Sequence, residues 1–247
     1  MGSWEKQVQR QRKRQPRTEP PVEGRAAKKR RLTRSKLLNA AYQVMSKTGV
    51  DAAKIIDITN QADVGFGTFY NYFETKDELA SQLLDCVIDD LGRRNDGATK
   101  DLRTKNPSFV MPVSIRLWLR EAVHAPMWEW WALRPDLLVN RLREGFGPFG
   151  KRDMREAVAR GTFKIAEEDV EPLWALACWM MVGGVHDIDV GRRPEQDESV
   201  VVEAIMRMMG VEPKVARRLS RGKLPTLPPA AVNWYFEIPK GESTATT

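Results

Sequence analysis

The sequence predicts an all-α protein with a small N-terminal three-helix domain and a larger helical body. Two observations predict this fold class. Apolar residues recur every three to four positions through most of the chain after residue 32, which is typical of amphipathic helices. The alternation of apolar and polar residues that marks a half-buried strand is missing from the pattern until segment 221–247. We therefore divide the chain into an arm at 1–31, the small domain at 32–76, the body at 77–220 and a tail at 221–247.

The small domain is predicted to begin with one long amphipathic helix. Thr33 is a suitable N-cap for this helix, and Gly49 is a suitable C-terminal stop. The helix carries one apolar stripe, made of Leu37, Leu38, Ala41, Val44 and Met45. We expect this stripe to pack against the helices that follow.

Two short helices are predicted next, over 53–62 and 66–72, with a turn at Asp63 between them. Asp tolerates a left-handed backbone better than most residues, so it suits a tight turn. Two short helices joined by such a turn and braced by a longer helix form the helix-turn-helix plan, whose second helix fits the roughly 12 Å major groove of DNA. We place this motif at residues 54–73.

A fourth helix is predicted to start at a capping box. Thr75 and Glu78 have the spacing at which a hydroxyl and a carboxylate satisfy free N–H groups at a helix start. The apolar spacing continues to about Leu91, and the polar residues 92–107 are predicted to form a loop or a frayed helix end.

The body is predicted to consist of further helices at 110–125, 136–145, 152–160, 168–185 and 199–209. The helix at 168–185 is apolar on nearly all sides, which indicates burial in a core or against a partner. Gly183 and Gly184 either permit close helix contact or end this helix. The tail at 221–247 is predicted to lie extended along the body or a partner subunit.

Positive charge is concentrated at the N-terminus. The whole chain has a net charge of +7, yet residues 1–31 hold eleven Lys or Arg against three Glu. This arm is either a contact for a polyanion, most simply nucleic acid, or a solvated tail that aids solubility. Its prolines and its lack of large apolar residues predict disorder in the unbound protein.

The composition favours few function classes. With 2 His and 2 Cys, and without a Gly-rich phosphate loop, a nucleophile elbow or metal-ligand spacing, the sequence predicts no catalytic residue, no metal site and no cofactor. The longest apolar run, 173–185, is shorter than the roughly 20 residues that span a bilayer. No secretory signal is recognised, so we expect a cytoplasmic protein that is neither an enzyme nor a membrane protein.

Residues 49–76, and 62–76 above all, closely resemble the DNA-binding domain of the TetR family of transcriptional regulators. That family's pattern is approximately A-G-V-S-x-G-T-x-Y-x-H/Y-F-x-x-K, and its spacing is intact here. The departures are Asp63 for the turn glycine, Gly65 for the serine that opens the recognition helix, Phe66 for a polar residue, and Lys54 for a common threonine. They bear on sequence preference rather than on the binding mode.

The resemblance implies a set of DNA-contacting residues: Lys54, Gly65, Phe66, Gly67, Thr68, Tyr70, Asn71, Tyr72 and Lys76. Lys76 is expected to meet a phosphate at the start of the fourth helix. Tyr72 is placed between core and groove, while Phe69 and Phe73 are expected to pack inward.

The resemblance further implies a homodimeric regulator, usually a repressor, that binds a palindromic double-stranded operator. Helices 168–185 and 199–209 are then expected at the dimer interface. A small apolar or amphipathic effector is expected in a pocket lined by Trp118, Met127, Trp128, Trp131, Trp174 and Trp179, although ordinary core packing also explains these side chains. The other hypotheses are an enzyme that uses this pocket and an architectural DNA binder dominated by the arm.

Overall fold

The computed structural model describes residues 24–194 and 197–230, and these residues form helices and connecting loops without a strand. The all-α prediction is therefore confirmed. The α-helices are α2 (Arg25–Ala52), α3 (Ile55–Gln61), α4 (Phe66–Phe69), α5 (Lys76–Lys105), α6 (Val110–His124), α7 (Met127–Ala132), α8 (Pro135–Gly145), α9 (Gly147–Ala159), α10 (Val170–Asp189), α11 (Glu198–Met208) and α12 (Pro213–Ser220). Two 3-10 turns lie at Pro107–Phe109 and Glu167–Asp169.

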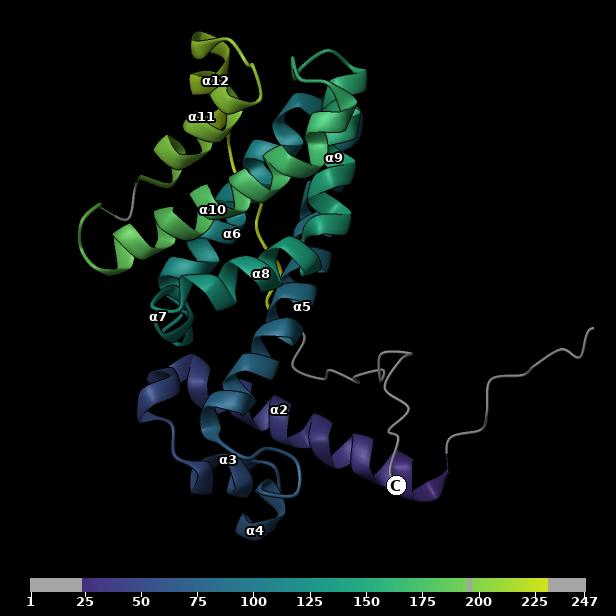
Figure 1. Ribbon diagram of the computed structural model, residues 1–247, viewed down its shortest axis with the longest axis vertical. Helices are drawn as coiled ribbons and strands as arrows, with labels where there is room; N and C mark the ends of the chain where they lie inside the picture. Colours follow the sequence, from purple (N-terminus) through teal and green to yellow (C-terminus); the bar gives the residue numbers. More distant parts are fainter. Residues whose placement is uncertain (1–23, 195–196, 231–247) are drawn as a thin grey trace, which may run out of the picture.

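Helices α2, α3 and α4 form a small unit at one end of the molecule, and α5 leads from this unit into the body (Figure 1). The stripe predicted on α2 is largely buried, with Leu37, Leu38, Ala41 and Met45 all at 0% exposure. Ile58 of α3 and Phe69 of α4 are equally buried. Helix α2 packs against α3, and α3 packs against α4.

Helix α2 starts earlier than predicted. It begins at Arg25, with Gly24 rather than Thr33 as its N-cap. The prediction of disorder is therefore wrong for residues 25–31, because Ala, Lys and Arg are good helix formers that extend a helix already held by packing. Residues 1–23 of the arm lie outside the described residues. Near its other end, Gly49 leaves the helical conformation with φ 77° and ψ 168°, as the predicted stop requires.

The turn and the capping box are both confirmed. Asp63 has a φ of 53°, in the left-handed region. The Glu78 backbone N–H donates to Thr75 Oγ1 at 3.0 Å, and the Glu74 N–H donates to Glu78 Oε2 at 2.7 Å. The start of α5 is thus held in a defined orientation directly after the motif.

Helix α5 continues to Lys105, so the loop or frayed helix end predicted at 92–107 is wrong. Some of the polar residues in this stretch face inward, whereas Arg93, Lys100 and Lys105 are exposed. Asn95 and Thr99 are buried at 3% and 0% exposure, and the Thr99 hydroxyl donates to the Asn95 carbonyl at 2.9 Å. The polar stretch is therefore helical and has a polar side that faces inward. The whole of α5 has 30 residues and spans about 45 Å.

The body is a bundle in which α10 crosses α6 and packs beside α8, with α9 at one side and α11 and α12 above (Figure 1). Gly183 and Gly184 lie inside α10, which runs on to Asp189. A Cβ at Gly184 would lie 2.7 Å from Val201 Cγ2 of α11. Of the two explanations for this Gly pair, close helix contact is the one that Gly184 fulfils.

The described part of the tail is extended and follows the body. Arg116 Nη1 donates to the Gly222 carbonyl at 2.6 Å, and Arg94 Nη1 donates to the Pro228 carbonyl at 2.8 Å. These bonds fix residues 222–228 to α6 and α5, as predicted for the start of the tail. Residues 231–247 lie outside the described residues.

Cys86 and Cys178 are free and buried, and burial raises the pKa of the Cys178 thiol to about 12. Among the described helices, none combines the length and apolar character needed to cross a bilayer.

Candidate DNA interface and effector cavity

The helix-turn-helix motif presents most of its predicted DNA-contacting residues to solvent. Lys54, Gly65, Phe66, Gly67, Tyr70 and Asn71 are exposed, and Thr68, Tyr72 and Lys76 are half-buried. Phe69 and Phe73 are buried at 0% and 1% exposure, so their predicted inward packing is confirmed. The exposed side chains of this short segment therefore lie over its buried aromatic residues, Phe69 and Phe73.

Two aromatic side chains and one aliphatic side chain stand out on this surface. Phe66 and Tyr70 are 48% and 52% exposed, and their rings meet edge to face at 5.7 Å. Ile56 of α3, which the sequence reasoning missed, is 43% exposed. Large apolar groups held in water beside a recognition helix are suited to thymine methyl groups and sugars.

Lys76 has an internal role in addition to any DNA contact. Its Nζ donates to the carbonyls of Asp51 and Ala53, at 2.7 and 3.1 Å. These carbonyls precede α3, so the ammonium ties the entry of the motif to the first turn of α5. One of its three N–H groups remains for a phosphate.

A basic face lies along the first part of α2. Arg25, Lys28, Lys29 and Lys36 line an open groove with Leu32 and Thr33, at helical spacing along one side of the helix. No carboxylate lies among the residues lining this groove. The guanidinium of Arg30 lies 5.8 Å from the centre of the Tyr72 ring, which places this part of α2 next to the motif.

The body contains a mostly enclosed, mainly apolar cavity of about 30 Å³ between α5, α6, α9 and α10. This space holds about two water molecules. Its apolar wall consists of Met111, Ile115, Phe146, Phe149, Trp174 and Met181. Two methionines in the wall allow the space to adapt, because Met side chains repack easily.

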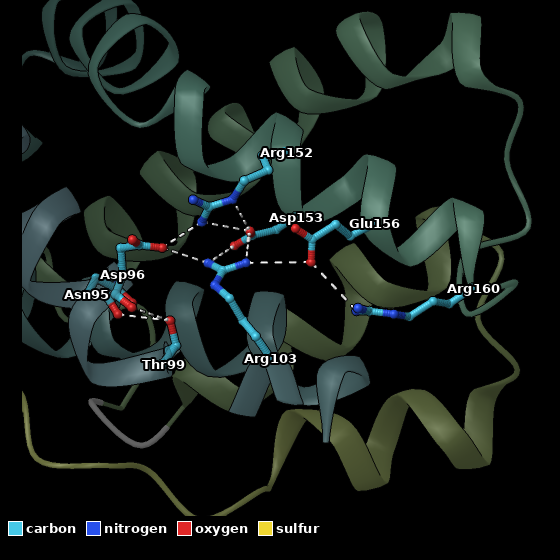
Figure 2. A network of polar contacts seen from close by, with 8 residues as sticks. All are labelled: Asn95, Asp96, Thr99, Arg103, Arg152, Asp153, Glu156 and Arg160. Atoms are coloured by element: carbon cyan, nitrogen blue, oxygen red, sulfur yellow. Dashed lines mark hydrogen bonds and ion pairs between the residues drawn. The ribbon is translucent and has the colours of Figure 1, made fainter. Parts of the chain in front are cut away.

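Three charged residues, Asp96, Arg103 and Asp153, line the cavity. They form a network of polar contacts with Arg152 (Figure 2). Arg103 Nη1 donates to Asp153 Oδ1 at 2.6 Å, and its Nη2 donates to Asp96 Oδ1 at 2.7 Å. Arg152 donates to the same Asp96 oxygen at 2.6 Å. Burial raises the pKa of Asp96, but the hydrogen bonds and charges of Arg152 and Arg103 outweigh burial and hold this pKa below its usual value. The carboxylate of Asp96 is therefore an ionised acceptor.

Asn95 provides an unused hydrogen-bond acceptor in the cavity wall. Its Nδ2 donates to the Ser114 carbonyl at 2.7 Å, whereas its buried Oδ1 has no partner among the described residues. A buried carbonyl oxygen without a partner costs free energy until a donor reaches it. The cavity is thus suited to a small ligand that has an apolar ring and a hydroxyl group, which would donate to Asn95 Oδ1.

The six residues predicted to line an effector pocket are not brought together. Trp174 lies in the cavity wall. Trp118, Trp128 and Trp131 are fully buried and pack edge to face, with ring centres 5.7 and 5.1 Å apart, and Met127 is buried at 1% exposure. Trp179 is 43% exposed on α10. The Trp128 ring contacts both Trp118 and Trp131, so these three side chains pack as a group outside the cavity wall.

The sequence reasoning missed the polar residues of the cavity. Asn95, Asp96, Thr99 and Arg103 have helical spacing i, i+1, i+4 and i+8, and this inward-facing polar stripe was interpreted as a loop. Among the described residues, no three His, Cys, Asp or Glu side chains are grouped so as to hold a metal ion.

A second apolar surface lies on α10 and α11. Leu176 and Trp179 of α10 are 51% and 43% exposed, and Val200 of α11 is 42% exposed. Gly183 continues the line along α10, with nothing within 4 Å of a Cβ built on it. Two neighbouring helices therefore expose apolar groups on the elements expected to form a dimer.

Family models match both parts of the chain. Residues 37–83 match the model for bacterial regulatory proteins of the tetR family, and residues 106–221 match the model for a tetracyclin repressor-like C-terminal domain. The fold and the exposed motif define a DNA-binding transcriptional regulator of the helix-turn-helix class. The chain belongs to the TetR family, whose members generally bind DNA and are not enzymes.

Individual relatives agree with this assignment. An uncharacterized HTH-type transcriptional regulator from Bacillus subtilis (strain 168), YvdT, is 41% identical over 66 residues, which cover 25% of this chain and 34% of that relative. The crystal structure of RolR in complex with the ligand resorcinol has a TM-score of 0.72 and 25% identity, and the alignment covers 82% of this chain and 100% of RolR. RolR without ligand has a TM-score of 0.69 at 23% identity, covering 78% and 100%, and shows the same fold.

Proposed function

We propose that this protein is a homodimeric repressor of a palindromic operator and that a small hydroxylated aromatic compound releases it from DNA. The single observation that carries the effector class is the cavity in which the Asn95 Oδ1 lacks a donor beside an apolar wall. A phenolic hydroxyl supplies that donor, and its ring occupies the apolar space.

The similarity to RolR supports this choice of effector. RolR has been crystallised with resorcinol, a benzene ring with two hydroxyl groups. In this chain, Asn95 and the carboxylate of Asp96 both line the cavity. Two hydroxyl groups on one ring match two acceptors on one wall. The cavity of about 30 Å³ must widen to admit a ring, which the side chains of Met111 and Met181 permit.

A homodimer is supported by the exposed apolar face of α10 and α11. Leu176, Trp179 and Val200 lose water only when a second surface covers them. A second copy of the chain fits, because a two-fold interface uses the same patch on both subunits. Two motifs in a dimer then read two half-sites about 34–36 Å apart, or a multiple of this distance.

Release from the operator is supported by the position of α5. Asn95, Asp96 and Arg103 lie toward one end of this helix, and Lys76, bonded to the entry of the motif, lies at the other. A ligand that favours one placement of α5 shifts the population of dimer spacings only if its affinity for the two states differs. Binding in the cavity therefore reaches the DNA surface through a continuous helix.

The test combines operator selection with a ligand titration. A duplex selected from a random pool is expected to be palindromic, and 1 mM resorcinol is expected to raise its Kd at least tenfold in gel shifts at fixed salt. The variant Gly150→Ala should lose this response, because its Cβ would lie 2.3 Å from the Trp174 ring in the cavity wall. The matched control is Gly97→Ala, whose Cβ meets nothing within 4 Å.

Two outcomes separate this proposal from its alternatives. Equal affinity for selected and scrambled duplexes at every salt concentration would make the protein an architectural binder. A selected duplex whose Kd does not change with resorcinol in the unmodified chain would reject the effector class and leave the regulator itself in place.

A further inference from the structure

Helix α6 borders a second hollow on the side opposite the effector cavity. This hollow is open to solvent, has a volume of about 360 Å³, and lies between α6, the start of α11 and the residue after α12. Arg116, Leu119, Arg120 and Val123 of α6 line it. The effector cavity uses Met111, Ser114 and Ile115 of the same helix, so the two spaces share no lining residue.

One wall of the hollow is an Arg–Glu–Arg triad. Glu198 is buried, with 6% of its side chain exposed, and its Oε1 accepts from Arg116 Nη2 at 3.2 Å. The same oxygen accepts from Nε and Nη2 of Arg120, at 3.0 and 2.8 Å. Two guanidinium groups thus share one carboxylate, and the triad has one positive charge in excess.

A second triad adjoins the first through Arg221, which also lines the hollow. Glu203 pairs with Arg221 at 2.9 Å and with Arg217 at 3.5 Å. This group again contains two cations and one anion. Within the described part of the chain, the two triads together have two positive charges in excess of their carboxylates. Of their members, Arg116, Arg120, Glu198 and Arg221 line the hollow.

Arg116 also has an unsatisfied donor. Its side chain is 9% exposed, its Nη1 is used by the Gly222 carbonyl and its Nη2 by Glu198. Its buried Nε has no hydrogen-bond partner among the described residues. A buried charged donor without a partner is unfavourable, and a nearby anion reduces its cost.

We infer that this hollow is a second ligand site, for a small organic carboxylate. Arg120 and Arg221 are 52% and 49% exposed, so their guanidinium groups are accessible to a ligand. Arg binds carboxylates in a bidentate fork. Leu119 and Val123 supply an apolar flank that an inorganic oxyanion leaves unused. This site goes beyond the proposed function, because it does not depend on the effector cavity or on DNA.

The test uses thermal unfolding of the full chain with sodium butyrate as the probe. At 100 mM, butyrate is expected to raise the Tm by about 5 °C relative to sodium chloride of equal ionic strength, for a Kd of about 1 mM. Isothermal titration of butyrate provides the Kd directly.

Three variants make the result specific. Arg120→Gln is expected to remove the Tm increase and to raise the Kd at least tenfold, while Arg116 still pairs with Glu198. Arg221→Gln is a second such variant, because Glu203 keeps Arg217. Arg155→Gln is the control, since Arg155 is a 46% exposed arginine that pairs with Glu167 away from the hollow. It should respond to butyrate as the unmodified chain does.

The inference is overturned if butyrate and chloride give the same Tm, or if both hollow variants keep the butyrate response. It is also overturned if sodium phosphate of equal ionic strength produces as large an increase as butyrate, because the apolar flank would then contribute nothing.

Discussion

Replacing Asp153 with Ala tests the charged network at the end of the effector cavity. Asp153 belongs to α9, and its side chain is 5% exposed. It accepts from Arg103 at 2.6 and 3.3 Å and from Arg152 at 3.1 and 3.0 Å (Figure 2). The substitution leaves two guanidinium groups without their most buried acceptor.

The expected loss follows from what the two arginines retain. Removing one partner of a fully buried pair costs about 3–5 kcal/mol. Here Asp96 still accepts from Arg103 at 2.7 Å and from Arg152 at 2.6 Å. We therefore expect Asp153→Ala to reduce the free energy of unfolding by about 2–3 kcal/mol. For a chain of this size, that loss lowers the Tm by about 4–12 °C.

The assay is urea unfolding followed by circular dichroism and tryptophan fluorescence. Arg155→Ala on the same helix is the matched control, since Arg155 and Glu167 are 46% and 60% exposed and 2.8 Å apart. An exposed pair contributes about 0–1 kcal/mol. If the two variants lose the same free energy, or if Asp153→Ala loses less than about 0.5 kcal/mol, the reasoning about burial is refuted.

Three further predictions concern pH, assembly and salt. The pKa of Asp96 is lowered in the folded state. Its stabilising contribution is therefore present above the unfolded pKa of about 4 and is lost as the pH falls through the lower folded value. In Asp96→Asn, the free energy of unfolding measured in urea should change less between pH 5 and pH 2 than in the unmodified chain. Leu176→Glu should convert a dimer into a monomer in light scattering, whereas Leu133→Glu, at a similarly exposed leucine (50% against 51%), should not; a dimeric Leu176→Glu would contradict the interface. Replacing Lys28 and Lys29 with Gln should reduce the slope of log K against log salt by about 1.8 and leave operator preference intact; an unchanged slope would show that this face of α2 does not meet phosphates.

The helix-turn-helix region could be predicted from the sequence in unusual detail. The turn at Asp63, the capping box at Thr75 and Glu78, and the inward packing of Phe69 all depend on local backbone chemistry and short spacings. Such features require only neighbouring residues, so a single sequence contains the information.

The effector cavity could not be predicted in the same way. Asn95 and Asp96 look solvated in the sequence, and only the tertiary approach of α6 and α9 turns them inward. Conversely, the tryptophans chosen for the pocket were selected by residue type, and three of them contact one another instead. Burial of a polar side chain against a distant helix leaves no local trace. Its partners are up to 56 residues away in the chain, as Arg152 is from Asp96.

The unbroken helix α5 has a mechanical consequence. Nineteen residues separate Lys76 from Asn95, which corresponds to about 28 Å of helix axis. If the helix pivots at the cavity, a tilt of about 6° displaces its first turn by about 3 Å, close to the 3.4 Å rise of one base pair. Because Lys76 holds the carbonyls that precede α3, the recognition segment travels with it. Under the proposed release mechanism, a tilt of this size would shift the recognition segment by about one base pair along the DNA.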